Sequence, residues 1–173
     1  METTANLSVF LVDDDKMFLT SMAHQLKQMF IYNPNIKTFQ SGEECLRNME
    51  SKPNLVILDY YLNSVNPDAM NGMQVLKKIK QVSPESTVIM LSGQDKMEVA
   101  IDTMTHGAYD YVVKNENVFL RTKNAIINAA HSISLSREVK DYKFWMRVFF
   151  ATIIVVVAVV IDLLIHNPRI FIP

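Results

Sequence analysis

The sequence has little cysteine and no excess of basic charge. Cys45 is its only cysteine, which excludes a disulfide framework and favours a reducing compartment. Lysine and arginine total 17 against 18 aspartates and glutamates, so the basic surplus of a nucleic-acid-binding domain is absent. The first six residues have neither a basic residue nor an apolar stretch, so no signal peptide is expected there. We therefore expect a cytoplasmic domain that binds no nucleic acid.

Glycine and proline are both missing between Gly107 and Pro168. A flexible tether normally contains such residues, so the last helix of the domain is expected to continue toward the C-terminus. Ser132, Ser134 and Ser136 are weak helix formers, and a break at this point stays open.

One long hydrophobic run stands out from an otherwise mixed sequence. Residues 148–165 form a stretch of 18 residues whose only charge is Asp162. As a helix this stretch covers ~27 Å, close to the ~30 Å hydrocarbon core of a bilayer. We expect a transmembrane helix, with Asp162 reaching for headgroups or water near its far end. The alternative is a buried helix or strand in the core of an oligomer.

The residues before this run predict how the span is oriented. Phe144 and Trp145 stand where an interfacial aromatic belt would lie. Basic residues on the same side favour a cytoplasmic flank, although Arg169 on the other side weakens the bias; they are Lys140, Lys143 and Arg147. The expected location is therefore a cytoplasmic domain anchored to the inner membrane by its C-terminal helix.

Upstream of this run, short apolar stretches alternate with segments of helical period. The expected strands are 7–12, 36–39, 55–58, 88–91 and 111–113, and the expected helices are 16–30, one opened by Ser41, 73–81, 96–105 and a fifth after the last strand. Strand 55–58 is apolar throughout, which is typical of a strand buried on both faces. The alternation predicts an α/β fold, a parallel sheet covered by helices on both faces.

The expected organisation has four parts. Residues 1–130 form the globular domain and 131–147 a helical connector. Residues 148–165 form the membrane span, and 166–173 a short external tail.

Polar residues that could bind a ligand or react with one follow four of the predicted strands. Asp13 and Asp14 follow the first strand, Asp59 the third, Ser92 the fourth and Lys114 the fifth. In an open α/β sheet, ligands bind outside the carboxyl ends of the strands, and the first and third strands are neighbours in the commonest five-stranded order. We therefore expect these groups to meet at one edge of the sheet.

The consecutive carboxylates Asp13, Asp14 and Asp15 predict a cation among them, because crowded like charges are costly. Mg²⁺ prefers hard oxygen ligands and commonly bridges one or two carboxylates to a phosphate. A carboxylate nucleophile at Asp59 could then attack a phosphoryl group whose charge the metal neutralises. Taken alone, the acidic run could instead cap the following helix.

Four segments together resemble the receiver domains of two-component response regulators. They are Phe10 to Asp15 (FLVDDD), Val56 to Leu62 (VILDYYL), Val88 to Gly93 (VIMLSG) and Gly107 to Lys114 (GAYDYVVK). The resemblance covers residues 6 to about 130. It implies a flavodoxin-like doubly wound sheet of five parallel strands in the order 2-1-3-4-5.

The resemblance also implies roles for individual residues. Asp59 would be the phosphoacceptor and also a metal ligand. Asp14 would be a direct Mg²⁺ ligand, with Asp13 acting mainly through water. The backbone carbonyl of Tyr61 would complete the protein ligands of the metal. Ser92 and Lys114 would hold the phosphoryl oxygens. Tyr111 would be the switch aromatic.

Three departures from the family pattern qualify these roles. The glycine expected about eight residues after the phosphoacceptor is Gly72, thirteen residues after Asp59, so the loop 63–70 carries roughly five extra residues and could form a partner surface. Asn115 replaces the proline that usually follows the lysine. Gln94, two residues after Ser92, is expected to tune hydrolysis of the phosphorylated form.

The favoured hypothesis is a membrane-anchored, single-domain response regulator that is not an enzyme beyond self-phosphorylation and autodephosphorylation. A sensor histidine kinase or a phosphotransfer protein would phosphorylate Asp59. Output would pass through an unknown protein partner, through the anchor, or through dimerisation on the face made by the fourth helix, the fifth strand and the fifth helix.

Two alternatives stay open at this point. One is a constitutive adaptor with the same fold and no phosphorylation. The other is a phosphatase of the haloacid dehalogenase type, suggested by the acidic run after the first strand, although Met17 stands where such enzymes have Thr or Val and no late acidic pair follows.

Overall fold

The computed structural model describes residues 7–30, 34–64, 66–94 and 96–166, without the side chains of 134–141, 143, 160 and 163–166. The chain divides into two compact units, Met1–Ile133 and Ser134–Pro173. The boundaries predicted for four parts stay a prediction, and the predicted tail lies outside the described residues from 167 onward.

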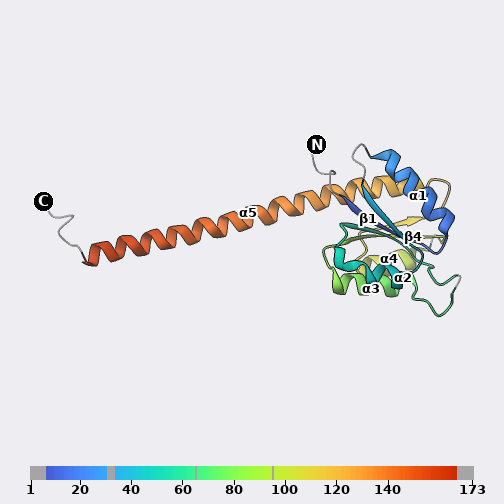
Figure 1. Cartoon of the computed structure of the whole chain (residues 1–173), viewed down its shortest axis with the longest axis horizontal. Helices are drawn as coiled ribbons and strands as arrows, with labels where there is room; N and C mark the ends of the chain where they lie inside the picture. Colours follow the sequence, from blue (N-terminus) through green and yellow to red (C-terminus); the bar gives the residue numbers. More distant parts are fainter. Residues whose placement is uncertain (1–6, 31–33, 65, 95, 167–173) are drawn as a thin grey trace. The chain divides into compact units, whose positions relative to one another are not determined.

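The first unit contains a five-stranded parallel sheet in the order β2-β1-β3-β4-β5 (Figure 1). The strands are β1 Ser8–Val12, β2 Asn35–Phe39, β3 Leu55–Asp59, β4 Thr87–Ser92 and β5 Asp110–Val113. The helices are α1 Lys16–Met29, α2 Gly42–Arg47, η1 Met49–Ser51, α3 Gly72–Val82, α4 Met97–Thr105 and α5 Val118–His166. The flavodoxin-like fold predicted from the sequence is confirmed.

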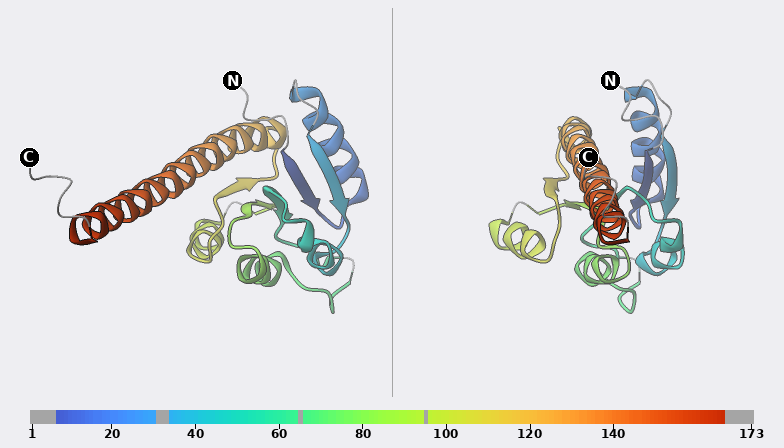
Figure 2. Two further views of the ribbon diagram at one scale, coloured as in Figure 1. Left: turned by 60° about the vertical axis from the view of Figure 1, so that its left-hand side comes forward. Right: turned by 90° about the vertical axis from the view of Figure 1, so that its left-hand side faces the viewer.

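Each face of the sheet has its own apolar core, because alternate strand residues point to opposite faces. In β1, Val9 and Leu11 pack toward α1 and the start of α5, whereas Phe10 and Val12 pack toward α2 and α3. Figure 2 shows α3 and α4 on one side of the sheet and α1 on the other. Burial on both faces explains why the central strands are apolar throughout.

Local capping fixes where the helices begin. The Asp15 carboxylate accepts hydrogen bonds from the backbone N–H groups of Met17 and Phe18 and so caps α1. Asn71 and Gln74 form a reciprocal capping box at the start of α3. The third carboxylate of the acidic run therefore serves the helix, and the other two are left for the sheet edge.

Helix α5 runs without a break from Val118 to His166, as the absence of glycine and proline predicts. The break left open at the three serines is not formed.

The structure corrects the expectation of a membrane anchor. Within the described part of the chain, no helix has both the length and the apolar character needed to span a bilayer. Asp162 interrupts the apolar run, whose uncharged part, residues 148–161, covers ~21 Å of helix against a hydrocarbon core of ~30 Å. The predicted transmembrane helix, and the localisation at the inner membrane that depended on it, are therefore wrong.

Candidate functional site

The carboxyl ends of four strands meet at one edge of the sheet. The register pairs Val12 with Leu58, Asp59 with Leu91, and Ser92 with Val113. The backbone N–H of Lys114 donates to the carbonyl of Ser92 at 2.7 Å. The sheet therefore presents the polar residues that follow or end these strands on the same side.

Three carboxylates cluster at this edge. Asp13, Asp14 and Asp59 each offer an oxygen, and these oxygens all lie within 4.8 Å of one another. Asp13 and Asp59 are only 2% and 3% exposed, and Asp14 is half-buried. One buried oxygen of Asp14, Oδ2, has no hydrogen-bond partner, which is costly for a group withdrawn from water.

Lys114 partly neutralises the cluster. Its Nζ lies 2.6 Å from Oδ2 of Asp13 and 2.8 Å from Oδ1 of Asp59, so one ammonium pairs with two carboxylates. The same Nζ lies 4.6 Å from the centroid of the Phe18 ring, a cation–π contact from α1. The replacement of the usual proline by Asn115 has not displaced Lys114 from the site.

Burial determines the protonation behaviour of these groups. Desolvation raises the pKa of Asp59 to about 6, although the nearby Lys114 opposes that shift. Desolvation likewise raises the pKa of Asp13. Burial alone would lower the pKa of Lys114, but the two carboxylates outweigh it and the pKa is raised. At neutral pH the site therefore holds ionised carboxylates that are short of compensating positive charge.

The acidic cluster fits Mg²⁺. Carboxylate oxygens are the ligands that this ion prefers, and the unpartnered oxygen of Asp14 is a free donor of that kind. The backbone carbonyl of Tyr61, the fourth predicted ligand, accepts a hydrogen bond from the Ser64 hydroxyl at 2.8 Å. A carbonyl oxygen has two lone pairs, so this bond leaves one for a metal.

Stability and metal binding should depend on pH through Asp59. Since its pKa is about 6 in the folded chain and 3.8 as a free side chain, folding takes up a proton between these values. We expect the metal-free protein to lose stability as pH rises through this window, and Mg²⁺ to relieve the loss above it. Below about pH 6, protons should compete with the metal, weakening its affinity by up to about tenfold per pH unit for each proton displaced.

Thermal unfolding with and without MgCl₂, at matched ionic strength and over a range of pH, measures both effects. A stabilisation by Mg²⁺ that is as large at pH 5 as at pH 8 would contradict the predicted competition.

Ser92 and Tyr111 lie on neighbouring strands and both contact Gln94. The Ser92 hydroxyl is fully buried, and its oxygen accepts a hydrogen bond from the backbone N–H of Gln94 at 3.2 Å. The Tyr111 hydroxyl donates to the backbone carbonyl of Gln94 at 2.6 Å. The predicted hydroxyl group, switch aromatic and hydrolysis residue are therefore in one hydrogen-bonded unit.

Gly72 lies directly against the backbone of Asp59. A Cβ at this position would come within 2.1 Å of the Asp59 carbonyl oxygen and 2.7 Å of the Tyr60 Cα. The backbone N–H of Gly72 donates to the Tyr60 carbonyl at 2.9 Å. Despite the extra residues between them, the start of α3 thus packs tightly behind Asp59.

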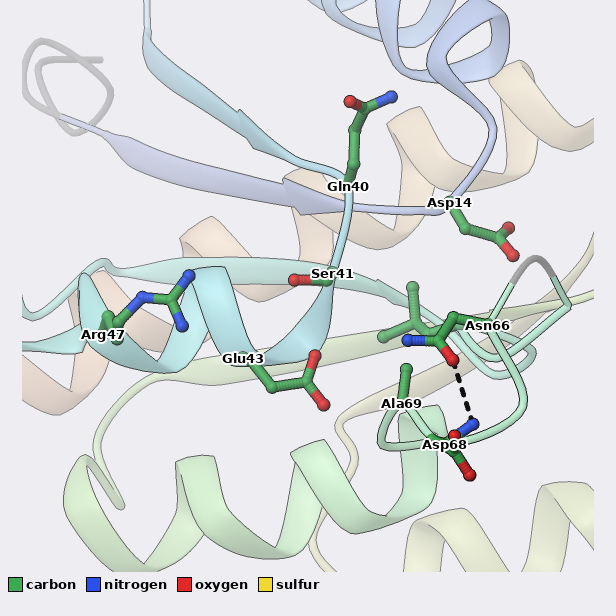
Figure 3. A pocket seen from close by; sticks show the side chains of 9 residues that line it. Asp14, Gln40, Ser41, Glu43, Arg47, Asn66, Asp68 and Ala69 are labelled. Atoms are coloured by element: carbon green, nitrogen blue, oxygen red, sulfur yellow. Dashed lines mark hydrogen bonds between the residues drawn. The ribbon is translucent and has the colours of Figure 1, made fainter.

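The loop from β3 to α3 borders a polar pocket of about 580 Å³ (Figure 3). Glu43 of α2 holds the end of the loop, since its Oε1 accepts a hydrogen bond from the backbone N–H of Met70 at 2.8 Å. Asp14 lines the same pocket, which therefore adjoins the acidic cluster.

Several of these contacts could not be predicted from the sequence. The contact between Phe18 and Lys114 is one of them, because nothing in the spacing of the apolar residues of α1 indicates it. The bond from Met70 to Glu43 joins residues 27 positions apart, and neither lies in a motif. Both depend on how side chains are oriented once the elements pack.

Comparison with known proteins agrees with this geometry. The family model described as response regulator receiver domain matches residues 9–122. A response regulator of Rickettsia felis described as NtrX-like is 30% identical over 143 residues, covering 80% of this chain and 28% of the relative. The chain thus spans less than a third of the length of this relative.

Solved structures show the same similarity. The signal receiver domain of a Luxo repressor protein from Vibrio parahaemolyticus is 27% identical with a TM-score of 0.66, covering 76% of this chain and 95% of that one. NtrX from Brucella abortus is 27% identical with a TM-score of 0.69, covering 80% of this chain and 30% of that one.

Proposed function

The chain belongs to the family of response regulator receiver domains, and on this premise we propose that it accepts a phosphoryl group on Asp59 in a Mg²⁺-dependent phosphorelay. Receiver domains of this kind interact with sensor kinases, and we propose a sensor histidine kinase or a phosphotransfer protein as the donor. The observation that carries the proposal is the buried Asp59 carboxylate, which shares an ammonium with Asp13 and lies within one metal-binding group of carboxylates.

The transfer requires an ionised Asp59. One carboxylate oxygen attacks phosphorus, an O–P bond forms, and the N–P bond to the donor imidazole breaks as that ring takes up a proton. Bound Mg²⁺ would be held by Asp13, Asp14, Asp59 and the Tyr61 carbonyl and would supply positive charge to the phosphoryl oxygens. Lys114 supplies a second positive charge, and Ser92 donates a hydrogen bond from its hydroxyl.

The proposed activity is limited to the domain's own phosphorylation and its reversal. We propose that the chain is a phosphoacceptor with at most self-phosphorylation and autodephosphorylation, because the groups at the sheet edge form one acceptor site. A constitutive adaptor would not need this complete set.

We propose that output passes through contacts with proteins, including a second copy of the chain. Three apolar side chains of α4 are exposed, by 78%, 60% and 46% for Met97, Ile101 and Met104. Tyr111, on the strand beside α4, connects this face to Gln94 and so to the site. A change in hydrogen bonding at Ser92 would therefore alter a face suited to partners.

Incubation with acetyl phosphate and Mg²⁺ tests the proposed function. We expect the intact protein to gain the mass of one phosphoryl group, in a linkage that hydroxylamine cleaves as it does an acyl phosphate. Omission of Mg²⁺ should prevent the gain. A protein that stays unmodified in the presence of metal and donor would instead be the constitutive adaptor.

Gln94 should influence how long the phosphoryl group persists. Its side-chain Oε1 is buried without a hydrogen-bond partner, as expected for a group that would position a water molecule. We expect Gln94→Ala to lengthen the lifetime of the phosphorylated form by about 2- to 12-fold, the equivalent of one lost hydrogen bond of roughly 0.5–1.5 kcal/mol. The decay of the phosphorylated protein after donor removal measures this lifetime, and an unchanged decay would exclude the role.

A further inference from the structure

The pocket beside the acidic cluster is a half-open hollow with walls from three parts of the fold. Its volume is about 580 Å³, within the range of roughly 300–1,000 Å³ typical of ligand sites. Nine residues line it, from the segment after β1, from the stretch between the end of β2 and the end of α2, and from the loop after β3; they are Asp14, Gln40, Ser41, Glu43, Arg47, Leu62, Asn66, Asp68 and Ala69.

The part of the loop that lines the pocket is held in place by hydrogen bonds within the loop. The backbone N–H of Asp68 donates to the Asn66 side chain at 3.1 Å, and that of Ala69 donates to the Asn66 carbonyl at 3.0 Å. The bond from Met70 to Glu43 joins this wall to α2. The extra residues of the loop thus build a wall of the pocket.

The charges lining the pocket favour a cation. Three carboxylates, from Asp14, Glu43 and Asp68, line it together with one guanidinium, that of Arg47. The hydrogen bond from the Met70 N–H lowers the pKa of Glu43, which therefore stays ionised at neutral pH. In Figure 3 the Glu43 carboxylate extends from α2, and that of Asp14 from the end of β1, toward the space beside the loop. Leu62 is the only large apolar side chain of the lining.

We propose that this pocket receives an arginine side chain of a partner protein. Its acceptor oxygens come from different directions, and a guanidinium carries five N–H donors in a fixed plane that can reach several of them together. An anionic ligand is disfavoured by the excess of carboxylates. Among the described residues, Glu43 and Asp68 join no group able to hold a metal ion, so a second divalent cation is not favoured either.

The pocket shares a residue with the proposed phosphoacceptor site. Asp14 belongs both to the lining and to the acidic cluster at Asp59, so a bound arginine lies next to the phosphoacceptor site. A partner docked here is recognised through residues of the long loop, which is where this chain departs from the pattern of its family. Binding of arginine in the pocket requires no phosphoryl group on Asp59.

Titration of the full chain with N-acetyl-arginine N-methylamide tests the proposal. We expect the NMR signals of the amides of Asp68, Ala69 and Met70 to shift with saturable dependence on concentration. The citrulline analogue, which has the same shape without the charge, should leave them in place. Glu43→Gln and Asp68→Asn should each weaken binding about two- to fivefold, the range for partly exposed ion pairs.

Glu98→Gln is the matched control, because it removes a carboxylate from the exposed start of α4, outside the pocket. It should leave the affinity unchanged. Glu43→Gln could loosen the loop, because the Glu43 carboxylate accepts the bond from Met70. Asp68→Asn is then the second test, since the loop bonds named above use the backbone N–H of Asp68 and not its carboxylate. The same variants should still be phosphorylated by acetyl phosphate. A pocket that binds no arginine can therefore be distinguished from an Asp59 that accepts no phosphoryl group.

Three results would overturn the proposal. They are equal shifts with the citrulline analogue, an affinity insensitive to both substitutions, and larger shifts at the same amides with inorganic phosphate, which would indicate an anion site at Arg47.

Discussion

Replacing Asp59 with asparagine is expected to abolish phosphorylation of the chain by acetyl phosphate. An amide cannot act as the nucleophile, and the substitution removes the oxygen that lies 2.8 Å from the Lys114 ammonium. The side chain keeps its shape, and its remaining oxygen can still accept the hydrogen bond from the Tyr61 N–H. The metal-free variant should therefore fold. It also loses one of three crowded negative charges, which favours the folded state.

Asp15→Asn is the control for this result. Asp15 is in the same acidic run but caps α1, and asparagine caps helices as well as aspartate does. Intact-mass measurement should show phosphorylation of this variant to the wild-type extent and none of Asp59→Asn. A phosphoryl group retained in a folded Asp59→Asn protein would mean that another carboxylate is the acceptor.

The sequence predicts the sheet and its polar edge well because both follow from burial. A parallel strand covered on both faces must be apolar throughout, so β1, β3 and β4 are visible as runs, and the polar residues that end them are easily located. Their common position then follows from strand order. The expected strand limits differ from the structure by one residue or less.

Contacts between distant elements are the part that could not be predicted. Tyr111 and Gln94 are both recognisable by position, yet their hydrogen bond depends on the path of the chain after β4. The loop 63–70 is visibly long in the sequence, but only the bond between Met70 and Glu43 shows that it forms a wall.

Gly72→Ala is expected to lower the free energy of unfolding by about 3 kcal/mol, the upper range for overpacking. The added Cβ meets the carbonyl oxygen of Asp59 and the Cα of Tyr60, and backbone atoms cannot rotate away as a side chain could. Alanine is otherwise the better helix former, by up to roughly 1 kcal/mol in a helix interior, so a small gain in stability would be expected without this contact. The sign of the change, measured by chemical denaturation, therefore decides whether the backbone of α3 touches that of β3.

The same substitution should reduce phosphorylation, because relief of the contact must move Asp59. A displacement of ~1 Å can cost about 100-fold in rate. Gly93→Ala is the stability control, since a Cβ there would meet nothing within 4 Å and the change should stay within about 0.5 kcal/mol. If Gly72→Ala is stable but phosphorylated slowly, β3 has shifted while the fold is kept. If it is both stable and phosphorylated normally, the close packing behind Asp59 is not required.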